Sequence, residues 1–372
     1  MKNKTVLVVP DSYKGCLTSR QAGEAMARGI ERAGKGIKAV RFTASDGGEG
    51  FCDCMRELFG GELVSREVTY PDRSRGVASY LWCEESKTAY IELAAASGLT
   101  LVPPEARDPL KTTTIGTGEL IADAAARGAK KIIVGLGGSA TNDCGAGILY
   151  ALGCRFYGAQ CDEIFPCGGS LAIIKSADLS ALDNYRGIEF TAACDVTNPL
   201  CGTNGAAYVF APQKGARAED LTLLDAGAES FAKFAGINKD LPGSGAAGGC
   251  GGTLLSLFDA SFISGAELLA GSQPFVSALK NCRAVFTGEG RTDSQTARGK
   301  LASVIAAKAK EYGKPVIIVS GALEDCRELY ALGVTACFSI APRPMDLSEA
   351  FAEAEANITC TTENAARIIF AE

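Results

Sequence analysis

The chain has 372 residues, a net charge of −6 and no histidine, and 47% of its residues are hydrophobic. This length predicts two domains. The lack of histidine excludes a Ser-His-Asp site and any His-ligated metal, so proton transfer falls to Asp, Glu, Lys, Tyr or Cys. The acidic balance and the absence of a long basic run argue against nucleic acid as a partner, because phosphate backbones require clustered Lys and Arg.

The 15 cysteines are scattered along the chain and include no CxxC pair. We interpret most of them as small buried side chains in a reducing compartment. Residues 1–9 contain too short an apolar stretch for a signal peptide, and no apolar run is long enough to span a bilayer. We therefore expect a soluble, cytoplasmic protein with no membrane partner.

The first elements alternate between strand and helix. Residues Thr5–Val9 predict a buried strand, and a helix begins after Thr18, which has capping-box spacing to Gln21. Residues Ala39–Thr43 predict the next strand. Residues 62–93 then alternate apolar and polar side chains between turn signals, which is typical of antiparallel hairpins.

The later segments return to strand–helix alternation. A helix, a strand and a helix are expected over TGELIADAAARG, KKIIVGLGG and GAGILYALG, whereas the segment 159–260 is rich in loop signals. A strand over Ala284–Thr287, a helix over Lys300–Lys310 and a strand over Val316–Ser320 complete the pattern. Alternation at both ends around a middle with hairpins predicts one parallel-sheet domain that is interrupted by a second domain.

Four polar loops follow predicted strands: PDSYKG, SDGGEG, TGEGRTD and SGA. The carboxyl ends of parallel strands meet along one sheet edge, where open α/β sheets bind their ligands. Lys14 in the first loop can meet a carboxylate or a phosphate as a point charge. Asp46 or Glu49 in the second can accept a hydroxyl proton, although each loop by itself also fits a simple turn or helix cap.

The segment Gly137–Asp143 lies between a predicted strand and a predicted helix. Glycines let the backbone approach an anion, and free N–H groups can point at it. Ser139 and Thr141 can donate to phosphate oxygens, and Asp143 can serve Mg²⁺. The alternative is an ordinary glycine-rich turn in which Asn or Asp caps the helix.

The segment from Gly288 to Thr296 combines two carboxylates, an arginine and several hydroxyls directly after a strand. Such a mixture suits a charged ligand and its metal, although a solvated turn with a capping box is the alternative. Asp195 also follows a short apolar strand.

The common sequence motifs of nucleotide-binding proteins are either absent or in the wrong structural context. Gly243–Gly248 matches GxGxxG but follows NKDLP instead of a buried strand, which argues against a nicotinamide enzyme. The chain has no P-loop and no protein-kinase signature.

Seven motifs, in order, give the chain a family resemblance: PDSYKG, DGGEG, GGSATND, ACDVTNPLCG, PQKGA, GAAGG and TGEGRTDSQTARGK. Together they resemble the type I glycerate kinase family, from the first strand to about residue 321. The resemblance implies ATP-dependent phosphorylation of D-glycerate to 2-phosphoglycerate. It also implies a flavodoxin-like α/β domain formed by residues 1–64 and 272–372, with a mixed α/β domain, residues 65–271, inserted in the middle.

Other functions remain open at this stage. The product could be 3-phosphoglycerate, the acceptor could be another small hydroxy acid, or the chain could be a non-catalytic sensor of glycerate or nucleotide. The oligomeric state is not predicted.

We assign site roles as a hypothesis built on this resemblance. Lys14 and Arg291 bind the carboxylate of glycerate, and Ser12 also binds the substrate. Asp46 and Asp195 are the two candidates for the base, and Lys14 assists catalysis. ATP is bound by residues of two loops, namely Gly137, Gly138, Ser139, Thr141, Asn142, Gly288 and Glu289. Mg²⁺ is held by one or two of Asp143, Asp195 and Asp293.

Overall fold

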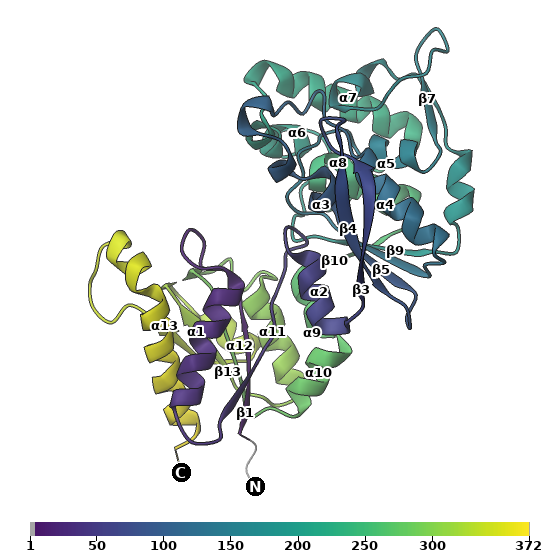
Figure 1. Ribbon diagram of the computed structural model, residues 1–372. Coiled ribbons are helices and arrows are strands. Elements are labelled where there is room, and N and C mark those ends of the chain that lie inside the picture. Colours follow the sequence, from purple (N-terminus) through teal and green to yellow (C-terminus); the bar gives the residue numbers. More distant parts are fainter. Residues whose placement is uncertain (1–3, 372) are drawn as a thin grey trace. The chain divides into compact units, whose positions relative to one another are not determined.

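The computed structural model describes residues 4–371. Its contacts divide the chain into two compact units, which are described separately here (Figure 1). The first unit comprises residues 1–44 and 265–372, and the second comprises Ser45–Ser264. The first unit is therefore formed by both ends of the chain.

The first unit is built on a five-stranded sheet with the order β15-β13-β11-β1-β2, in which every pairing is parallel. Renumbered within the unit, this order is 2-1-3-4-5, the flavodoxin-like order, which confirms the expected fold class. The order reverses between β1 and β11. The strands are β1 (Thr5–Pro10), β2 (Lys38–Arg41), β11 (Ala284–Gly288), β13 (Val316–Ser320) and β15 (Val334–Ser339).

Helices α1 and α13 lie side by side on this sheet (Figure 1). A Cβ on Gly29 of α1 would lie 2.3 Å from the carbonyl oxygen of Thr359 in α13, so only glycine permits this approach. Thr18 and Gln21 form the predicted capping box of α1. The helices of the unit are α1 (Ser19–Arg32), α9 (Gly265–Gly271), α10 (Gln273–Lys280), α11 (Leu301–Glu311), α12 (Arg327–Leu332) and α13 (Leu347–Ile369), and a small sheet pairs β12 (Arg291–Thr292) with β14 (Ala322–Leu323).

The second unit is built on a six-stranded mixed sheet with the order β10-β9-β6-β5-β4-β3. Strand β4 pairs antiparallel with both β3 and β5, which confirms the predicted hairpins. Strands β5, β6, β9 and β10 run parallel to one another. The strands are β3 (Glu62–Thr69), β4 (Arg75–Cys83), β5 (Thr88–Glu92), β6 (Lys131–Gly135), β9 (Glu189–Ala193) and β10 (Ser261–Ile263), and a separate pair joins β7 (Arg155–Tyr157) and β8 (Ser176–Asp178).

Three α-helices of the second unit lie within the segment 159–260, which was expected to be rich in loops. The helices of the unit are α2 (Phe51–Phe59), α3 (Leu93–Ser97), α4 (Ile115–Ala126), α5 (Ala146–Ala151), α6 (Ala206–Phe210), α7 (Ala218–Ala235) and α8 (Ala246–Leu257). Helix α7 has 18 residues. The first turn of α8 contains three residues in the left-handed conformation, Ala247, Gly248 and Gly249. Its many glycines disfavour a helix intrinsically, so tertiary contacts override the local preference.

The junctions between the units differ from the predicted ones. The predicted junctions are 64/65 and 271/272, whereas the contacts place the junctions at 44/45 and 264/265. The reason is packing: α2 contacts β4 and β5 of the second unit, and α9 contacts α11 of the first.

Both ends of the second unit lie beside β9. A Cβ on Gly47 would be 2.3 Å from the carbonyl oxygen of Ala193, and the Cys194 N–H donates to the carbonyl oxygen of Ile263 at 3.0 Å. The first and last residues of the second unit therefore lie close together, as is needed for a domain inserted into the chain of another domain.

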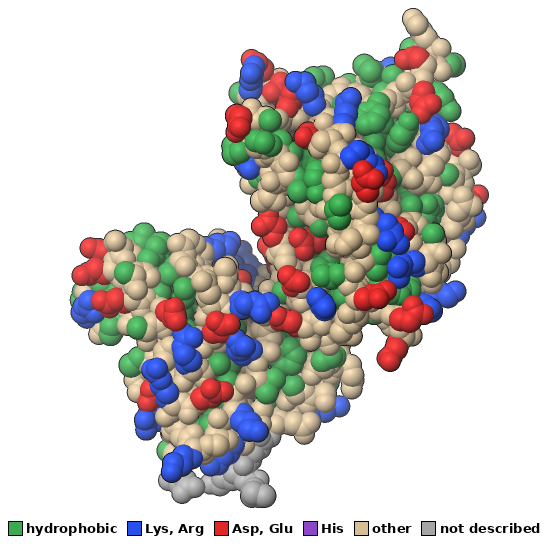
Figure 2. Space-filling model, in the orientation of Figure 1, with side chains coloured by type: hydrophobic (Ala, Val, Ile, Leu, Met, Phe, Trp, Pro, Cys, Tyr) green, Lys and Arg blue, Asp and Glu red, His purple; other side chains and the backbone are tan. Residues whose placement is uncertain are grey.

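The surface carries both signs of charge. Acidic and basic side chains are interspersed on the face shown in Figure 2. Among the described residues, no helix combines the length and the apolar character needed to cross a membrane.

Candidate active site

The first unit contains a pocket of about 710 Å³ at the carboxyl ends of β1, β11 and β13. One side, called the polar wall, consists of charged side chains from the loops after β1 and β11. Another part of the lining, called the apolar wall, comes from the segment after β15 and from α13. The polar wall is Asp11, Lys14, Glu289, Asp293 and Lys300, and the apolar wall is Ile340, Met345, Leu347, Ala350, Phe351 and Ala354.

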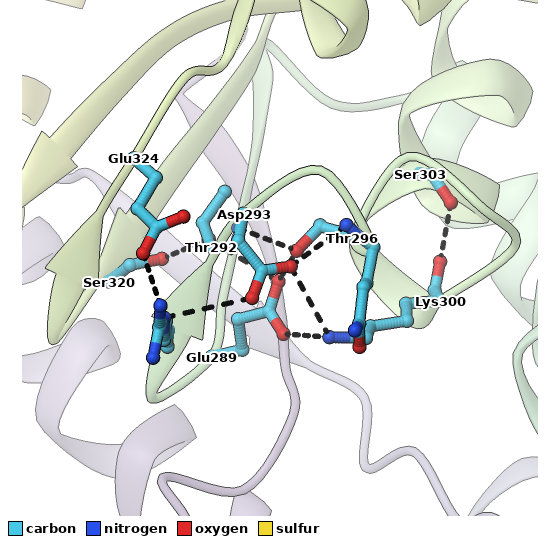
Figure 3. Close-up of polar contacts among 10 residues, drawn as sticks. Glu289, Thr292, Asp293, Thr296, Lys300, Ser303, Ser320 and Glu324 are labelled. Atoms are coloured by element: carbon cyan, nitrogen blue, oxygen red, sulfur yellow. Dashed lines mark hydrogen bonds and ion pairs between the residues drawn. The ribbon is translucent and has the colours of Figure 1, made fainter.

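Glu289 is the centre of a hydrogen-bond network in the polar wall (Figure 3). One carboxylate oxygen accepts from the Thr296 hydroxyl at 2.6 Å and from the Thr292 hydroxyl at 3.3 Å. The other lies 3.6 Å from the Lys300 ammonium, which is also 4.0 Å from Asp293. Burial raises the pKa of Glu289 above its usual value, while these hydrogen bonds and Lys300 oppose the rise.

The two cations assigned to the substrate carboxylate differ in their surroundings. Arg291 is paired with Glu324, and its Nε lies 3.7 Å from Asp293. Lys14 is exposed and forms no ion pair within residues 4–371. Lys14 is therefore the cation of this pocket that is available to an anionic ligand, whereas Arg291 is already neutralised.

Tyr13 fixes the loop that carries Lys14. Its buried hydroxyl donates to the carbonyl oxygen of Val319 in β13 at 2.5 Å. Burial raises the pKa of Tyr13 far above its usual value, so the phenol stays protonated as a donor. Gly288, at the end of β11, leaves no room for a side chain, because a Cβ there would lie 1.9 Å from the same carbonyl oxygen.

In the second unit, the loop after residue 44 lies against the segment Gly137–Asp143. The Gly137 N–H donates to the carbonyl oxygen of Gly47 at 3.0 Å, and a Cβ on Gly137 would lie 2.3 Å from the Cα of Gly48. Asp46 and Asp195 are both exposed at this edge. One oxygen of Asp46 accepts from the Gly48 N–H at 2.9 Å, which orients the carboxylate.

Most side chains of the Gly137–Asp143 segment face the interior. Thr141 and Asn142 are fully buried, and the Thr141 hydroxyl and both amide atoms of Asn142 have no hydrogen-bond partner among the described residues. Ser139 is 7% exposed, which leaves Gly138 as the exposed member of the segment. The backbone N–H groups of Gly138 and Ser139 donate to no acceptor in the described structure.

Lys214 is a buried lysine that the sequence analysis did not assign to the site. Its ammonium donates to the Ser139 hydroxyl and to the carbonyl oxygen of Thr141, both at 2.7 Å. Burial lowers the pKa of Lys214 to about 8. The motif PQKGA contains this lysine, but the sequence alone shows no link to a segment some seventy residues earlier.

Asp143 has a different environment from the one that a metal ligand needs. It is fully buried, and its oxygens accept from the Thr114 N–H at 2.8 Å, the Thr114 hydroxyl at 2.9 Å and the N–H groups of Gly145 and Gly147 at 3.2 Å. Burial raises the pKa of Asp143, and these hydrogen bonds oppose the rise. The contacts support a structural role that shapes the turn into α5.

The predicted site residues thus fall into two groups. Ser12, Lys14, Glu289, Arg291 and Asp293 line the pocket of the first unit. The remaining ones, except Gly288, belong to the second unit, namely Asp46, Gly137, Gly138, Ser139, Thr141, Asn142, Asp143 and Asp195.

Within residues 4–371, no group of three or more Cys, Asp or Glu side chains is arranged to hold a metal ion. Mg²⁺ in phosphoryl-transfer enzymes is usually bound by one or two carboxylates together with substrate phosphates. The partly exposed Asp293 and the exposed Asp195 fit that smaller requirement.

Comparisons with known proteins identify the same family over nearly the whole chain. The sequence profile of the Glycerate kinase family matches residues 6–370. Glycerate kinase of Bacillus subtilis (strain 168) is 41% identical over 94% of this chain and 93% of its own length. Glycerate 2-kinase of Escherichia coli (strain K12) is 41% identical over 97% of each chain.

A solved structure agrees as well. The crystal structure of a protein assigned as glycerate kinase 2 from Salmonella typhimurium LT2 superimposes with a TM-score of 0.82 at 40% identity, covering 100% of this chain and 99% of that one. The chain therefore belongs to the glycerate kinase family and is a kinase.

Proposed function

We propose that the chain transfers the γ-phosphoryl group of ATP to the 2-hydroxyl of D-glycerate, giving 2-phosphoglycerate and ADP. The observation that carries the proposal is the relation, over 97% of both chains, to a protein named Glycerate 2-kinase. The geometry supports it through exposed carboxylates and an available cation at the carboxyl ends of the strands, where α/β sheets bind substrates.

The proton of the attacking hydroxyl requires an acceptor, and Asp46 or Asp195 supplies it. The hydroxyl oxygen bonds to the γ-phosphorus, the bond to the bridging oxygen breaks, ADP leaves with that electron pair, and the proton passes to the carboxylate. Phosphoryl transfer depends mainly on positioning and charge neutralisation, so a carboxylate is an adequate base. The Gly48 N–H fixes one oxygen of Asp46 and leaves the other for the substrate.

Mg²⁺ would neutralise charge on the phosphates, and we propose either Asp293 or Asp195 as its carboxylate ligand. Asp143 is not a candidate, because four donors already satisfy its buried oxygens. The N–H groups of Gly138 and Ser139 are suited to an anionic oxygen of a bound ligand. We also propose a cytoplasmic location, which the free thiols of all cysteines support.

A coupled ADP-release assay with D-glycerate, L-glycerate and related hydroxy acids tests this proposal, followed by phosphorus NMR of the product. We expect turnover with D-glycerate and the resonance of 2-phosphoglycerate. Formation of 3-phosphoglycerate would contradict the proposed position of transfer. If folded protein releases no ADP with D-glycerate and Mg²⁺, D-glycerate is not the phosphoryl acceptor.

A further inference from the structure

The pocket of the first unit is much larger than the hydroxy acid. Its volume is about 710 Å³, within the range of roughly 300–1,000 Å³ in which proteins bury drug-sized ligands. D-glycerate has three carbons and would leave most of this space to water. Its size therefore points to a second, larger ligand of the reaction.

The apolar wall has no function in binding a small hydroxy acid. Leu347 is 69% exposed and Phe351 is 42% exposed, so two large apolar side chains are left uncovered at the pocket. The ring of Phe351 also lies next to the loop that bears Lys14, because a Cβ on Gly15 would be 3.6 Å from it. An aromatic surface next to a cation matches a ligand that joins a flat ring to an anionic group.

The polar wall offers one unpaired cation to such a ligand. Lys14 has no ion pair within the described residues, whereas Lys300 is paired with Glu289 at 3.6 Å and with Asp293 at 4.0 Å. The Lys14 ammonium can therefore meet phosphate oxygens as a point charge. Asp293 lies beside Lys300 and can meet a metal carried by the phosphates.

The position of the pocket supports the same ligand class. It lies at the carboxyl ends of β1 and β11, where the strand order of the first unit reverses. Open α/β sheets bind nucleotides in the crevice outside such a reversal, because the chain leaves neighbouring strands in opposite directions.

We infer that this pocket binds the nucleoside triphosphate, with its base against Phe351 and Leu347 and its phosphates toward Lys14. The inference rests on the proposed function, which requires such a donor. Lys14 then contacts a phosphate of ATP instead of the carboxylate of glycerate. ATP binds in this pocket instead of at the Gly137–Asp143 segment. The side chains of that segment are largely buried, and Lys214 donates to the Ser139 hydroxyl and to the carbonyl oxygen of Thr141.

A tryptophan reporter tests which ligand occupies the pocket. The single natural tryptophan, Trp82, is buried in the second unit, so the unmodified chain provides the background signal. In Phe351→Trp, ADP should produce a saturable fluorescence change that the unmodified chain lacks, whereas D-glycerate alone should produce none. A response to D-glycerate but not to ADP would overturn the inference.

Calorimetric titration with ADP tests the same contacts without a reporter. Phe351→Ala and Lys14→Met should each weaken ADP binding roughly tenfold or more, as expected for loss of base stacking or of a phosphate contact. Ile368→Ala is the control, because Ile368 lies on the same helix, is 70% exposed and is outside the pocket. Its ADP affinity should be unchanged.

The outcomes separate this inference from the proposed function. If the unmodified chain phosphorylates D-glycerate and binds ADP, but both variants keep its affinity within about twofold, the inference fails and the proposed function stands. If the unmodified chain binds no ADP and releases none with D-glycerate, the proposed function fails and the inference fails with it.

Discussion

Asp46 and Asp195 compete for the role of base at the same edge of the second unit. Asp→Asn keeps the size of each side chain and removes its ability to accept a proton. At the true base the change should lower kcat by roughly 10²–10⁴, while the affinity for ADP changes little. Steady-state kinetics and calorimetry measure the two effects.

Asp183→Asn is the matched control, since this carboxylate is 65% exposed and pairs with Arg186 on the surface. Near-normal kcat in both Asp46→Asn and Asp195→Asn would show that the proton goes elsewhere.

Lys214 makes a pH-dependent contribution to folding. Its pKa is lowered by burial from an ordinary value of 10.5 to about 8 in the folded chain, so between these values the unfolded state binds more protons. The free energy of unfolding should therefore rise with pH across this interval, by up to about 3 kcal/mol. Below pH 8 the full cost of burying the charge is present.

Urea denaturation from pH 7 to 10.5 measures this effect by comparison with Lys214→Met, whose stability curve should lack the rise. Lys130→Met is a control at an exposed position and should retain it. Parallel curves for Lys214→Met and the unmodified chain would contradict the prediction.

At the scale of elements, the start of α8 interlocks with the Gly137–Asp143 segment through Gly248. This residue has a φ of +66°, and a Cβ there would lie 2.0 Å from the carbonyl oxygen of Thr141. Gly236, after α7, has a φ of +77° and nothing within 4 Å of a Cβ. An added side chain would therefore strain the backbone at both Gly236 and Gly248, but only at Gly248 would it also clash with the backbone of Thr141.

Gly236→Ala should lower the free energy of unfolding by about 1–2 kcal/mol, from backbone strain alone. Gly248→Ala should lower the free energy of unfolding by roughly 1–3 kcal/mol more than Gly236→Ala, because its side chain is forced against the backbone. Chemical denaturation of both variants provides the comparison. Equal losses would mean that the backbone around Thr141 moves aside freely.

Elements with local signals were predictable from the sequence. Thr18 and Gln21 define the start of α1 through contacts within four residues, and the buried strands β1, β11 and β13 stand out as short apolar runs. Helix α8 was missed, because Gly248 and Gly249 serve close contacts with Thr141 and Cys144, far earlier in the chain, rather than the helix itself.

The candidate site was predictable at the level of loops, and less so at the level of side chains. Polar residues after strands could be expected to gather at a sheet edge, and Lys14 and Asp293 do line one pocket. The burial of Asp143 and the pairing of Arg291 with Glu324 depend on distant segments. No spacing rule relates such segments, so their polar residues look equally available in the sequence.

At the scale of the whole molecule, the second unit is continuous in sequence, and its ends meet beside β9. It also has its own apolar core, which includes Tyr80, Trp82, Ile91 and Val134. We expect a fragment of residues 45–264 to fold without the first unit. Far-UV circular dichroism and a single cooperative urea transition would support this, and a broad, non-cooperative transition would contradict it.

Assembly of the first unit from both chain ends has a consequence during synthesis. Strands β1 and β2 leave the ribosome early, but β11, the second partner of β1, and the covering helix α13 come only after residue 283. At roughly 5–20 residues per second, the apolar residues of β1 wait on the order of tens of seconds for their neighbours. The nascent chain therefore exposes the edge of β1 that later pairs with β11 while its middle is already able to fold, and we expect holdase chaperones to bind this N-terminal strand.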